Sequence, residues 1–437
     1  MLRLLSLLWF SLCSTLLIAQ TWTTTSAPTV PRYDDIYFLD EQRGWGAAPY
    51  QDFLGVDGQL VRTTDGGDTW DVLVPSTGYT YRSMAFFDDS LGFIGNLEAG
   101  QSANDTALII QTTDGGSSWF PVPNLPGPRP GGVCGMFRVN DSLLYAAGRY
   151  YGPAGVYKTT DRGNSWTYTD LDSLAGGLVD MYFWHADSGI VVGSSGLDWA
   201  DSAGVVLQTF DGGQSWQRIY RTQDDQAMCW KISFPSDQIG YISVQNFTGL
   251  NDHTVLKTTD RGVTWAELPY YSFSYNAQGV GFINDSVGFI GGTFNGSLNF
   301  ATTDGGLTWT NFFLGSRINR FRFPSDSVGY ASGRNIYKFD ATPVGLDAAL
   351  ADQIVVHPIY PNPVQERGVV VLELPTALPV ESELYGLDGK LIWSRDEGTL
   401  GAGEHQIEVP TGTLATGSYF LMLKMDGVVK GVSLVKQ

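Results

Sequence analysis

The segment Thr63–Trp70 reads TTDGGDTW, and the chain returns to the same eight-residue phrase five more times. The aspartates of the six copies are Asp65, Asp114, Asp161, Asp211, Asp260 and Asp304. Successive copies are 44 to 50 residues apart. A repeat of this length with strand-forming flanks predicts a propeller or another array of small sheets, and not a single irregular core.

The phrase has the composition of a turn between two strands. A short apolar run such as Ala107–Ile110 precedes it, and its final tryptophan opens the next run. This order predicts a hairpin. The aspartate can accept hydrogen bonds within its own turn, and the glycines after it tolerate positive φ. Six copies cannot all face one active site, so we interpret the six aspartates as structural.

A second phrase precedes each turn and begins with a phenylalanine. Its seven copies start at Phe38, Phe86, Phe137, Phe183, Phe234, Phe282 and Phe323, which predicts seven units. The seventh unit has only a degenerate turn at Asp340, without a tryptophan. Near the other end, Thr21-Trp22 begins TWTTTSAP, which has the pattern of the strand that follows the turn. We therefore predict that Trp22 completes the seventh unit and closes the ring, which removes exposed sheet edges.

The eight-residue phrase resembles the Asp-box (BNR) repeat, S/T-x-D-x-G-x-T-W. That repeat marks propeller blades in sialidases, sortilin-type receptors, xyloglucan-cleaving glycosidases and photosystem II assembly-factor-like proteins. These families share a blade and have no activity in common. The resemblance implies a seven-bladed β-propeller over residues 21–341 and leaves its function open.

Composition indicates an exported protein. Residues 1–20 carry one early arginine, an apolar stretch and a small residue at Ala19, as in a secretory signal peptide. No other segment has the run of about 18 apolar residues that crosses a bilayer. Cys134 and Cys229 fall in non-adjacent units, so we expect two free buried thiols. The net charge of −19 argues against nucleic-acid partners.

The chain changes character after residue 341. Residues 342–353 form a polar, alanine-rich linker, and residues 354–437 predict a small antiparallel β-sandwich, with hairpin turns at Asp388-Gly389 and Asp426-Gly427. This module resembles the type A C-terminal sorting domain of the Bacteroidetes type IX secretion system, through Pro361-Asn362-Pro363, the segment from Leu387 to Trp393, the pattern Gly417–Leu421 and the terminal LVKQ. The resemblance implies that the secretion machinery is its partner, and that the chain crosses both membranes to be released or held at the outer surface.

The variable loops between the second and third strands of each unit should share one face with the crossovers, opposite the aspartate turns. Function resides in loops held on a rigid frame. Aromatic and polar residues on this face suit a glycan or protein ligand. The candidates are Tyr50, Tyr79, Tyr81, Arg149, Tyr150, Tyr151, Trp199, Phe247, Tyr271 and Tyr275. Packing between blades is the alternative for each of them.

A third set of residues should line the central channel. The third residue before each phenylalanine gives a ring that includes the charged residues Asp35, Asp180, Lys231 and Arg320. Opposite charges fall in adjacent units, so we predict ion pairs of Asp180 with Lys231 and of Arg320 with Asp35.

A non-enzymatic, monomeric binding, adhesion or scaffold protein without cofactor or metal agrees best with these patterns. A glycoside hydrolase is the alternative. The early segment VPRYDD at 30–35 lacks the Arg-Ile-Pro expected of a sialidase, and xyloglucan-cleaving relatives place two carboxylates between two propellers, whereas this chain has one. Hydrolysis needs two carboxyls about 5–10 Å apart, and no sequence pattern establishes such a pair here. No GxSxG, HExxH or phosphate-binding loop is present.

Overall fold

The computed structural model describes residues 21–49, 59–74, 80–97, 107–128, 131–148, 153–196, 202–247, 253–271, 277–292, 298–312, 314–340, 353–386, 391–425 and 428–437. These residues contain no helix and form nine sheets. The chain divides into two compact units, one spanning Trp22–Asp340 and the other containing the described residues from Gln353 onward.

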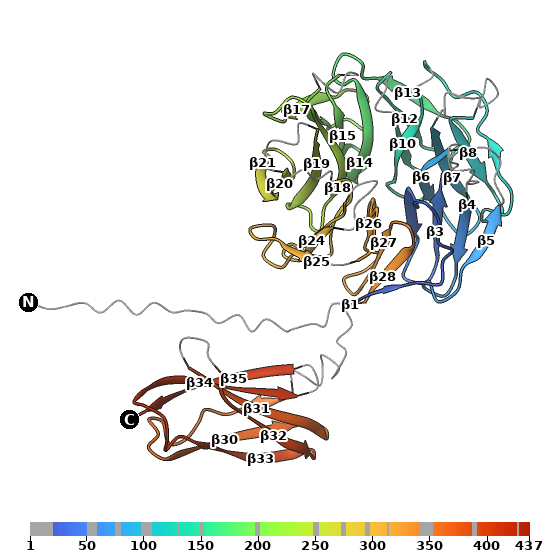
Figure 1. Cartoon of the computed structure of the whole chain (residues 1–437). Helices are drawn as coiled ribbons and strands as arrows, with labels where there is room; N and C mark the ends of the chain where they lie inside the picture. The colour runs from blue at the N-terminus through green and yellow to red at the C-terminus, as the bar shows by residue number, and fades with distance from the viewer. Residues whose placement is uncertain are drawn as a thin grey trace, which may run out of the picture. The chain divides into compact units, whose positions relative to one another are not determined.

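Seven four-stranded sheets surround a common axis in the first unit and form a seven-bladed β-propeller (Figure 1). Blade 1 contains β2 (Asp35–Phe38), β3 (Gly44–Ala48), β4 (Gln59–Thr63) and β5 (Asp71–Val74). Blade 2 contains β6 (Thr80–Phe86), β7 (Gly92–Leu97), β8 (Ile109–Thr112) and β9 (Phe120–Pro121). Blade 3 contains β10 (Val133–Arg138), β11 (Leu144–Gly148), β12 (Gly155–Thr159) and β13 (Thr167–Asp170). Blade 4 contains β14 (Gly177–His185), β15 (Ser188–Ser194), β16 (Gly204–Thr209) and β17 (Gln217–Arg221). Blade 5 contains β18 (Ala227–Ser233), β19 (Gly240–Asn246), β20 (His253–Thr258) and β21 (Ala266–Tyr271). Blade 6 contains β22 (Val280–Phe282), β23 (Gly288–Ile290), β24 (Asn299–Thr302) and β25 (Thr310–Phe312).

The seventh blade takes its outermost strand from the beginning of the unit, as the sequence predicted. Its order is β26 (Arg320–Arg322), β27 (Val328–Ser332), β28 (Ile336–Asp340) and then β1 (Thr21–Thr24). The indole of Trp22 in β1 packs among three aromatic rings at centroid distances of 5.3, 5.8 and 5.1 Å, those of Phe289, Phe321 and Phe339. Phe289 belongs to blade 6, so this one side chain joins the closing strand to two blades.

The phenylalanine phrase works by stacking between blades. Phe86 of blade 2 lies flat on Trp45 of blade 1, with ring centroids 3.8 Å apart. Equivalent stacks at 3.6, 3.9 and 3.5 Å join Phe38 to Tyr330, Phe183 to Tyr145 and Phe282 to Tyr241. The glycine that ends the phrase is required because a Cβ on Gly92 would lie 2.3 Å from the Phe86 ring.

The Asp box uses its carboxylate entirely within its own turn. The Oδ1 atom of Asp65 accepts hydrogen bonds from the Thr63 hydroxyl at 2.8 Å and the Thr69 amide at 2.9 Å, and its Oδ2 accepts the Thr69 hydroxyl at 2.5 Å. The other five boxes repeat this pattern. Hydroxyl and amide donors lower the pKa of Asp65 to about 2. The two residues after each aspartate have positive φ, as the glycines predict.

Neighbouring blades meet at the box in two ways. Where the box reads Asp-Gly-Gly, side chains of the preceding blade donate hydrogen bonds to a box carbonyl. The Tyr145 hydroxyl and the Lys158 ammonium donate to the Gly212 carbonyl at 2.9 and 2.8 Å. Tyr241 and Lys257 do the same to Gly305. Where the box reads Asp-Arg-Gly, the arginine instead points back, and Arg162 packs over the Phe87 ring of blade 2 at 5.1 Å.

The second unit is a small antiparallel β-sandwich. One sheet contains β29 (Val355–Val356), β30 (Arg367–Leu374) and β33 (Gly403–Pro410), and the other has the order β32 (Leu391–Leu400), β31 (Leu378–Gly386), β34 (Gly417–Met425) and β35 (Val428–Lys436). Alternating side chains from both sheets meet in one core that includes Leu372, Leu384 and Leu421. The predicted turns at 388–389 and 426–427 lie outside the described residues, and the strands that flank each turn pair antiparallel.

Candidate functional site

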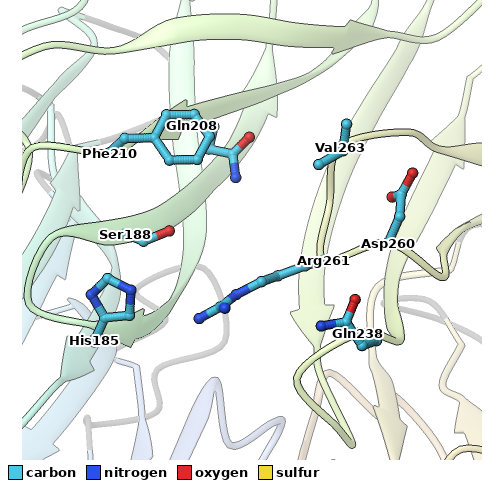
Figure 2. A pocket seen from close by; sticks show the side chains of 8 residues that line it. All are labelled: His185, Ser188, Gln208, Phe210, Gln238, Asp260, Arg261 and Val263. Carbon is cyan, nitrogen blue, oxygen red and sulfur yellow. The ribbon is translucent and has the colours of Figure 1, made fainter.

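A pocket of about 390 Å³ opens on the Asp-box side between blades 4 and 5 (Figure 2). It is lined by His185, Ser188, Gln208, Phe210, Gln238, Asp260, Arg261 and Val263. His185 ends β14 and Ser188 begins β15 of blade 4, and Phe210 belongs to the box of that blade. Asp260, Arg261 and Val263 belong to the box of blade 5. Phe210 and Val263 are 59% and 65% exposed and present apolar surface to the solvent.

This pocket was not predicted from the sequence, because the predicted binding residues lie on the face opposite the aspartate turns. The signal was present: the residue before the box aspartate is threonine in five copies and Phe210 in the sixth. A second pocket, of about 360 Å³, lies in the preceding groove, between blades 3 and 4. Lys158 occupies that groove and bonds to the next box, and the corresponding residue in blade 4 is Gln208.

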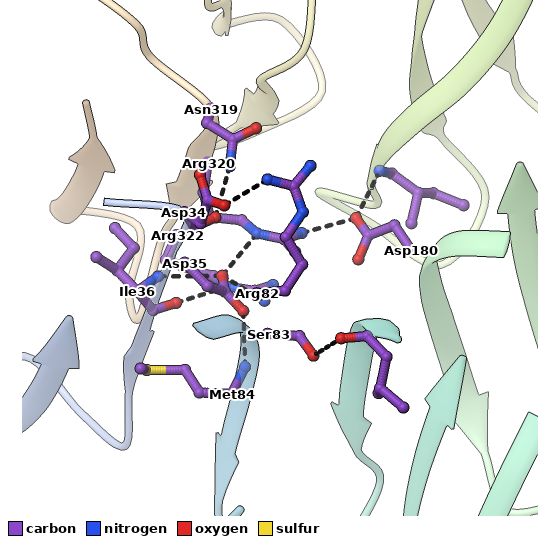
Figure 3. A network of polar contacts seen from close by, with 12 residues as sticks. Asp34, Asp35, Ile36, Arg82, Ser83, Met84, Asp180, Asn319, Arg320 and Arg322 are labelled. Carbon is purple, nitrogen blue, oxygen red and sulfur yellow. Dashed lines mark hydrogen bonds and ion pairs between the residues drawn. The ribbon is translucent and has the colours of Figure 1, made fainter. Parts of the chain in front are cut away.

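The channel residues form a buried cluster at the axis (Figure 3). The guanidinium of Arg320 donates from Nε to Asp35 at 2.8 Å and from a terminal nitrogen to Asp180 at 2.7 Å. Blade 7 is thereby joined to blades 1 and 4. The predicted pair of Asp35 with Arg320 is present. Asp35 also accepts the backbone amide of Met84 from blade 2 at 2.9 Å.

The predicted pair of Asp180 with Lys231 was wrong. Asp180 binds Arg320 from across the axis and accepts the Ile232 amide at 3.1 Å, and no carboxylate among the described residues lies within ion-pair distance of the Lys231 ammonium. Burial, and then repulsion from Arg320, lower the pKa of Lys231 to about 7 against the attraction of Asp180. The long side chain of Arg320 reaches across the channel to Asp180, so the partner of Asp180 is not in an adjacent blade.

Beside this ring, Asp34 binds two further arginines. Its carboxylate pairs with Arg32 and with Arg82 of blade 2, and Arg32 also donates to the Gln278 side chain of blade 6 at 3.1 Å. Arg82 extends to 5.8 Å from the ring centre of Trp230 in blade 5. Burial alone would raise the pKa of Asp34, but attraction to Arg32 and Arg82 outweighs it and holds the pKa below its usual value.

The buried carboxylates of the described propeller residues are therefore all bound to arginine. They are Asp34, Asp35 and Asp180. Burial also opposes ionisation of Asp180, and attraction to Arg320 and Lys231 still lowers its pKa. A general acid needs the opposite, a carboxyl whose pKa is raised so that it carries a proton near neutral pH. The cluster fixes blades to each other and offers no free carboxyl for acid–base chemistry.

The structure describes only three of the candidate residues predicted for the variable face. Tyr81 is 1% exposed and packs in the core between blades 1 and 2, so its assignment to the surface was wrong. Strand β6 begins before Tyr81 and carries its ring inward. Phe247 is half-buried against the core of blades 4 and 5. Tyr271 ends β21. The remaining candidates, Tyr50, Tyr79, Arg149, Tyr150, Tyr151, Trp199 and Tyr275, lie outside the described residues.

Cys134 and Cys229 are buried and free, as predicted. Within the described residues, no three His, Cys, Asp or Glu side chains gather as a metal site would require. No helix in the same part of the chain is long and apolar enough to cross a membrane.

Residues 358–437 match the family model described as the secretion system C-terminal sorting domain. This module is a type IX sorting domain. It directs the chain to the cell surface or to secretion. In the sorting domain, Asn362 of the Pro-Asn-Pro segment is bound to the final strand, because its side chain accepts the Val435 amide at 2.9 Å and donates to the Ser433 carbonyl at 3.2 Å.

The propeller is similar to proteins of several functions. Its sequence is 24% identical over 330 residues to the photosystem II assembly lipoprotein Ycf48 of Synechococcus sp. (strain CC9902), covering 70% of this chain and 84% of that protein. A structure of Ycf48 bound to D1 peptide matches with TM-score 0.53 and 18% identity, over 74% of this chain and 95% of the other.

PorZ, a surface component of the type IX secretion system of Porphyromonas gingivalis, matches with TM-score 0.56 and 12% identity, over 94% of this chain and 60% of PorZ. An ancestral GH74 enzyme matches with TM-score 0.50 and 12% identity, over 94% of this chain and 64% of the enzyme. These likenesses show the propeller fold, which is shared by non-enzymatic proteins and enzymes.

Proposed function

We propose that the propeller is a non-enzymatic binding module, an adhesion or scaffold protein that the sorting domain delivers to the outer surface or releases. In this proposal residues 1–20 are the signal peptide, 21–341 the working propeller, 342–353 a linker and 354–437 the address. The mature protein then meets a glycan or protein partner outside the cell.

The state of the axial carboxylates supports a binding role over hydrolysis. Each of the three axial carboxylates, Asp34, Asp35 and Asp180, binds an arginine of another blade. Retaining or inverting hydrolysis needs two carboxyls flanking one open site, one of them protonated. Using either Asp35 or Asp180 in this way would break the contacts that join blade 7 to its partners.

The similar solved structures are compatible with a binding function at the level of the fold. The Ycf48 structure contains a bound peptide, and PorZ is described as a surface component. A glycoside hydrolase is the alternative, because an enzyme of the GH74 family shares the architecture. Its residues would have to come from the variable loops, since the axial carboxylates are already bound.

The test uses the full chain purified after export. It is applied to a peptide array and a glycan array, and in parallel it is incubated with xyloglucan and a panel of chromogenic glycosides. We expect saturable binding to one array class and no release of reducing sugar or chromophore. Hydrolysis above that of a boiled sample would refute the non-enzymatic proposal, and so would the absence of any saturable ligand on both arrays.

A further inference from the structure

Two of the six boxes carry an arginine where the other four carry glycine. Arg162 and Arg261 have φ of 60° and 62°, in the left-handed region that glycine adopts without a Cβ clash. An arginine at this position strains the backbone, so its side chain should provide something that offsets the strain. The two arginines sit in equivalent places, which makes each a reference for the other.

Arg162 is fully provided with partners. It forms an ion pair with Asp88 of blade 2, donates to the Asp141 carbonyl at 2.8 Å and packs over the Phe87 ring. All three contacts come from the first turns of blades 2 and 3. The interface between these blades is therefore closed by a carboxylate that the chain itself supplies.

Arg261 has the ring and lacks the carboxylate. It packs over Trp184 at 5.2 Å, as Arg162 does over Phe87. The residue at the position of Asp88 is His185, and no carboxylate among the described residues forms an ion pair with Arg261. Its Nε atom is buried without a hydrogen-bond partner in the same part of the chain. The guanidinium extends into the pocket between His185 and Gln238 (Figure 2).

The other residues of the pocket also differ from those around Arg162 at the interface between blades 2 and 3. Ser188 stands where blade 2 has the larger Leu91, which opens space beside the guanidinium. Phe210 and Val263 expose apolar surface on the walls. The Nδ1 atom of His185 accepts the Asp187 amide at 3.3 Å, so in the neutral ring the proton lies on Nε2, which is a donor.

We propose that this pocket binds the carboxylate side chain of an acidic peptide, next to an apolar residue of the same peptide. The inference rests on the proposed binding function and names its ligand class. The peptide carboxylate would take the place that Asp88 holds against Arg162, so the chain itself indicates a carboxylate as the fitting anion. The neighbouring apolar side chain would cover Phe210 and Val263. Because the protein carries a net charge of −19, a single acidic residue in an uncharged segment suits the pocket better than a polyacidic one.

The probe is a set of fluorescein-labelled octapeptides that contain one Glu or Asp beside Leu, Val or Phe in a Ser/Gly background. Binding to the full chain is followed by fluorescence anisotropy, and the same peptides with Gln or Asn serve as neutral isosteres. We expect saturable binding of an acidic peptide and at least a tenfold weaker affinity for its isostere. Arg261→Gln should lower the affinity for the acidic peptide at least tenfold, and Arg162→Gln should leave that affinity unchanged.

The decisive variant is His185→Asp, which installs the carboxylate that blade 2 already has. It should pair with Arg261, maintain or raise the melting temperature, and lower peptide affinity at least tenfold. A well-folded His185→Asp protein that binds as tightly as the wild type would overturn the proposal. Equal affinity for Glu and Gln peptides, or no peptide binding at all, would do the same. If glycans bind while these peptides do not, this inference fails and the proposed function stands; measured hydrolysis would defeat the proposed function by itself.

Discussion

Replacing Arg320 with methionine should be among the most destabilising single changes in the propeller. Methionine keeps an unbranched chain of similar length and removes the guanidinium that binds Asp35 at 2.8 Å and Asp180 at 2.7 Å. Both carboxylates and Arg320 are at most 2% exposed. Two buried charges would lose their counterion at once, although each keeps a backbone amide donor.

Breaking a buried ion pair by removing one partner costs about 3–5 kcal/mol. The remaining amide donors and Arg322, whose guanidinium lies 3.7 Å from Asp35, should keep the loss within that range. At about 2.1 cal/mol/K per residue, a unit of about 320 residues has an unfolding entropy on the order of 0.7 kcal/mol/K. A loss of about 4 kcal/mol then lowers the melting temperature by about 6 °C.

The variant should also respond to pH in a characteristic direction. Without Arg320, burial should raise the folded-state pKa of Asp180 above the unfolded value of about 3.9. Protonation then stabilises the folded state, so the deficit relative to the wild type should shrink as pH falls from about 7 to 5. Calorimetry of the full chain at both pH values measures this change. Arg43→Met is the matched control, since Arg43 and its partners Asp40 and Asp89 are 42–62% exposed and such surface ion pairs contribute little to stability. Equal losses in the two variants, or a deficit independent of pH, would refute the assignment of an ionised buried cluster.

Three further changes test other parts of the frame. Trp22→Ala removes the ring that joins the closing strand to blades 6 and 7 and should cost about 3–5 kcal/mol in urea unfolding; an unchanged midpoint would contradict closure by β1. Gly92→Ala places a Cβ 2.3 Å from the Phe86 ring and should cost about 1–3 kcal/mol by calorimetry, whereas Gly401→Ala, with nothing within 4 Å, should cost far less. Hydrogen bonds lower the pKa of the box carboxylates of Asp65, Asp114 and Asp211 to about 2, so their stabilisation is complete above about pH 4 and is lost as pH falls toward 2. Acid titration of near-UV circular dichroism checks this, and a propeller that loses structure already near pH 5 would contradict it.

The periodic parts of the sequence determined the ring almost completely. Seven phenylalanine phrases gave seven blades, and the unit without a complete box pointed to Trp22 as the closing strand. Such features are predictable because every blade repeats the same local contacts, a Phe stacked on its neighbour and a carboxylate bound within its own turn. The pair of Asp35 with Arg320 was also accessible, since it joins adjacent blades.

Contacts across the axis were not accessible from the repeat. Asp180 and Arg320 belong to blades 4 and 7, and Arg82 of blade 2 reaches Trp230 of blade 5. A periodic pattern indicates which blades are neighbours, but it does not indicate whether a side chain is long enough to cross the channel. The pocket was missed for the opposite reason: it arises where the repeat is broken, at His185, Phe210 and Arg261, and an averaged pattern conceals such departures.

The two box types suggest why the pocket occurs where it does. At Asp-Gly-Gly boxes, a Tyr or Trp and often a Lys of the preceding blade donate hydrogen bonds to the box carbonyl. At Asp-Arg-Gly boxes the box itself provides the cation, and the preceding blade must supply the anion. Blade 2 does so with Asp88, and blade 4 has His185 in its place. Where the chain supplies no such carboxylate, as between blades 4 and 5, the arginine can accept an external one without breaking an ion pair of the Asp88–Arg162 kind. The interface between blades 4 and 5 is therefore where this propeller can gain a ligand at least cost to its frame.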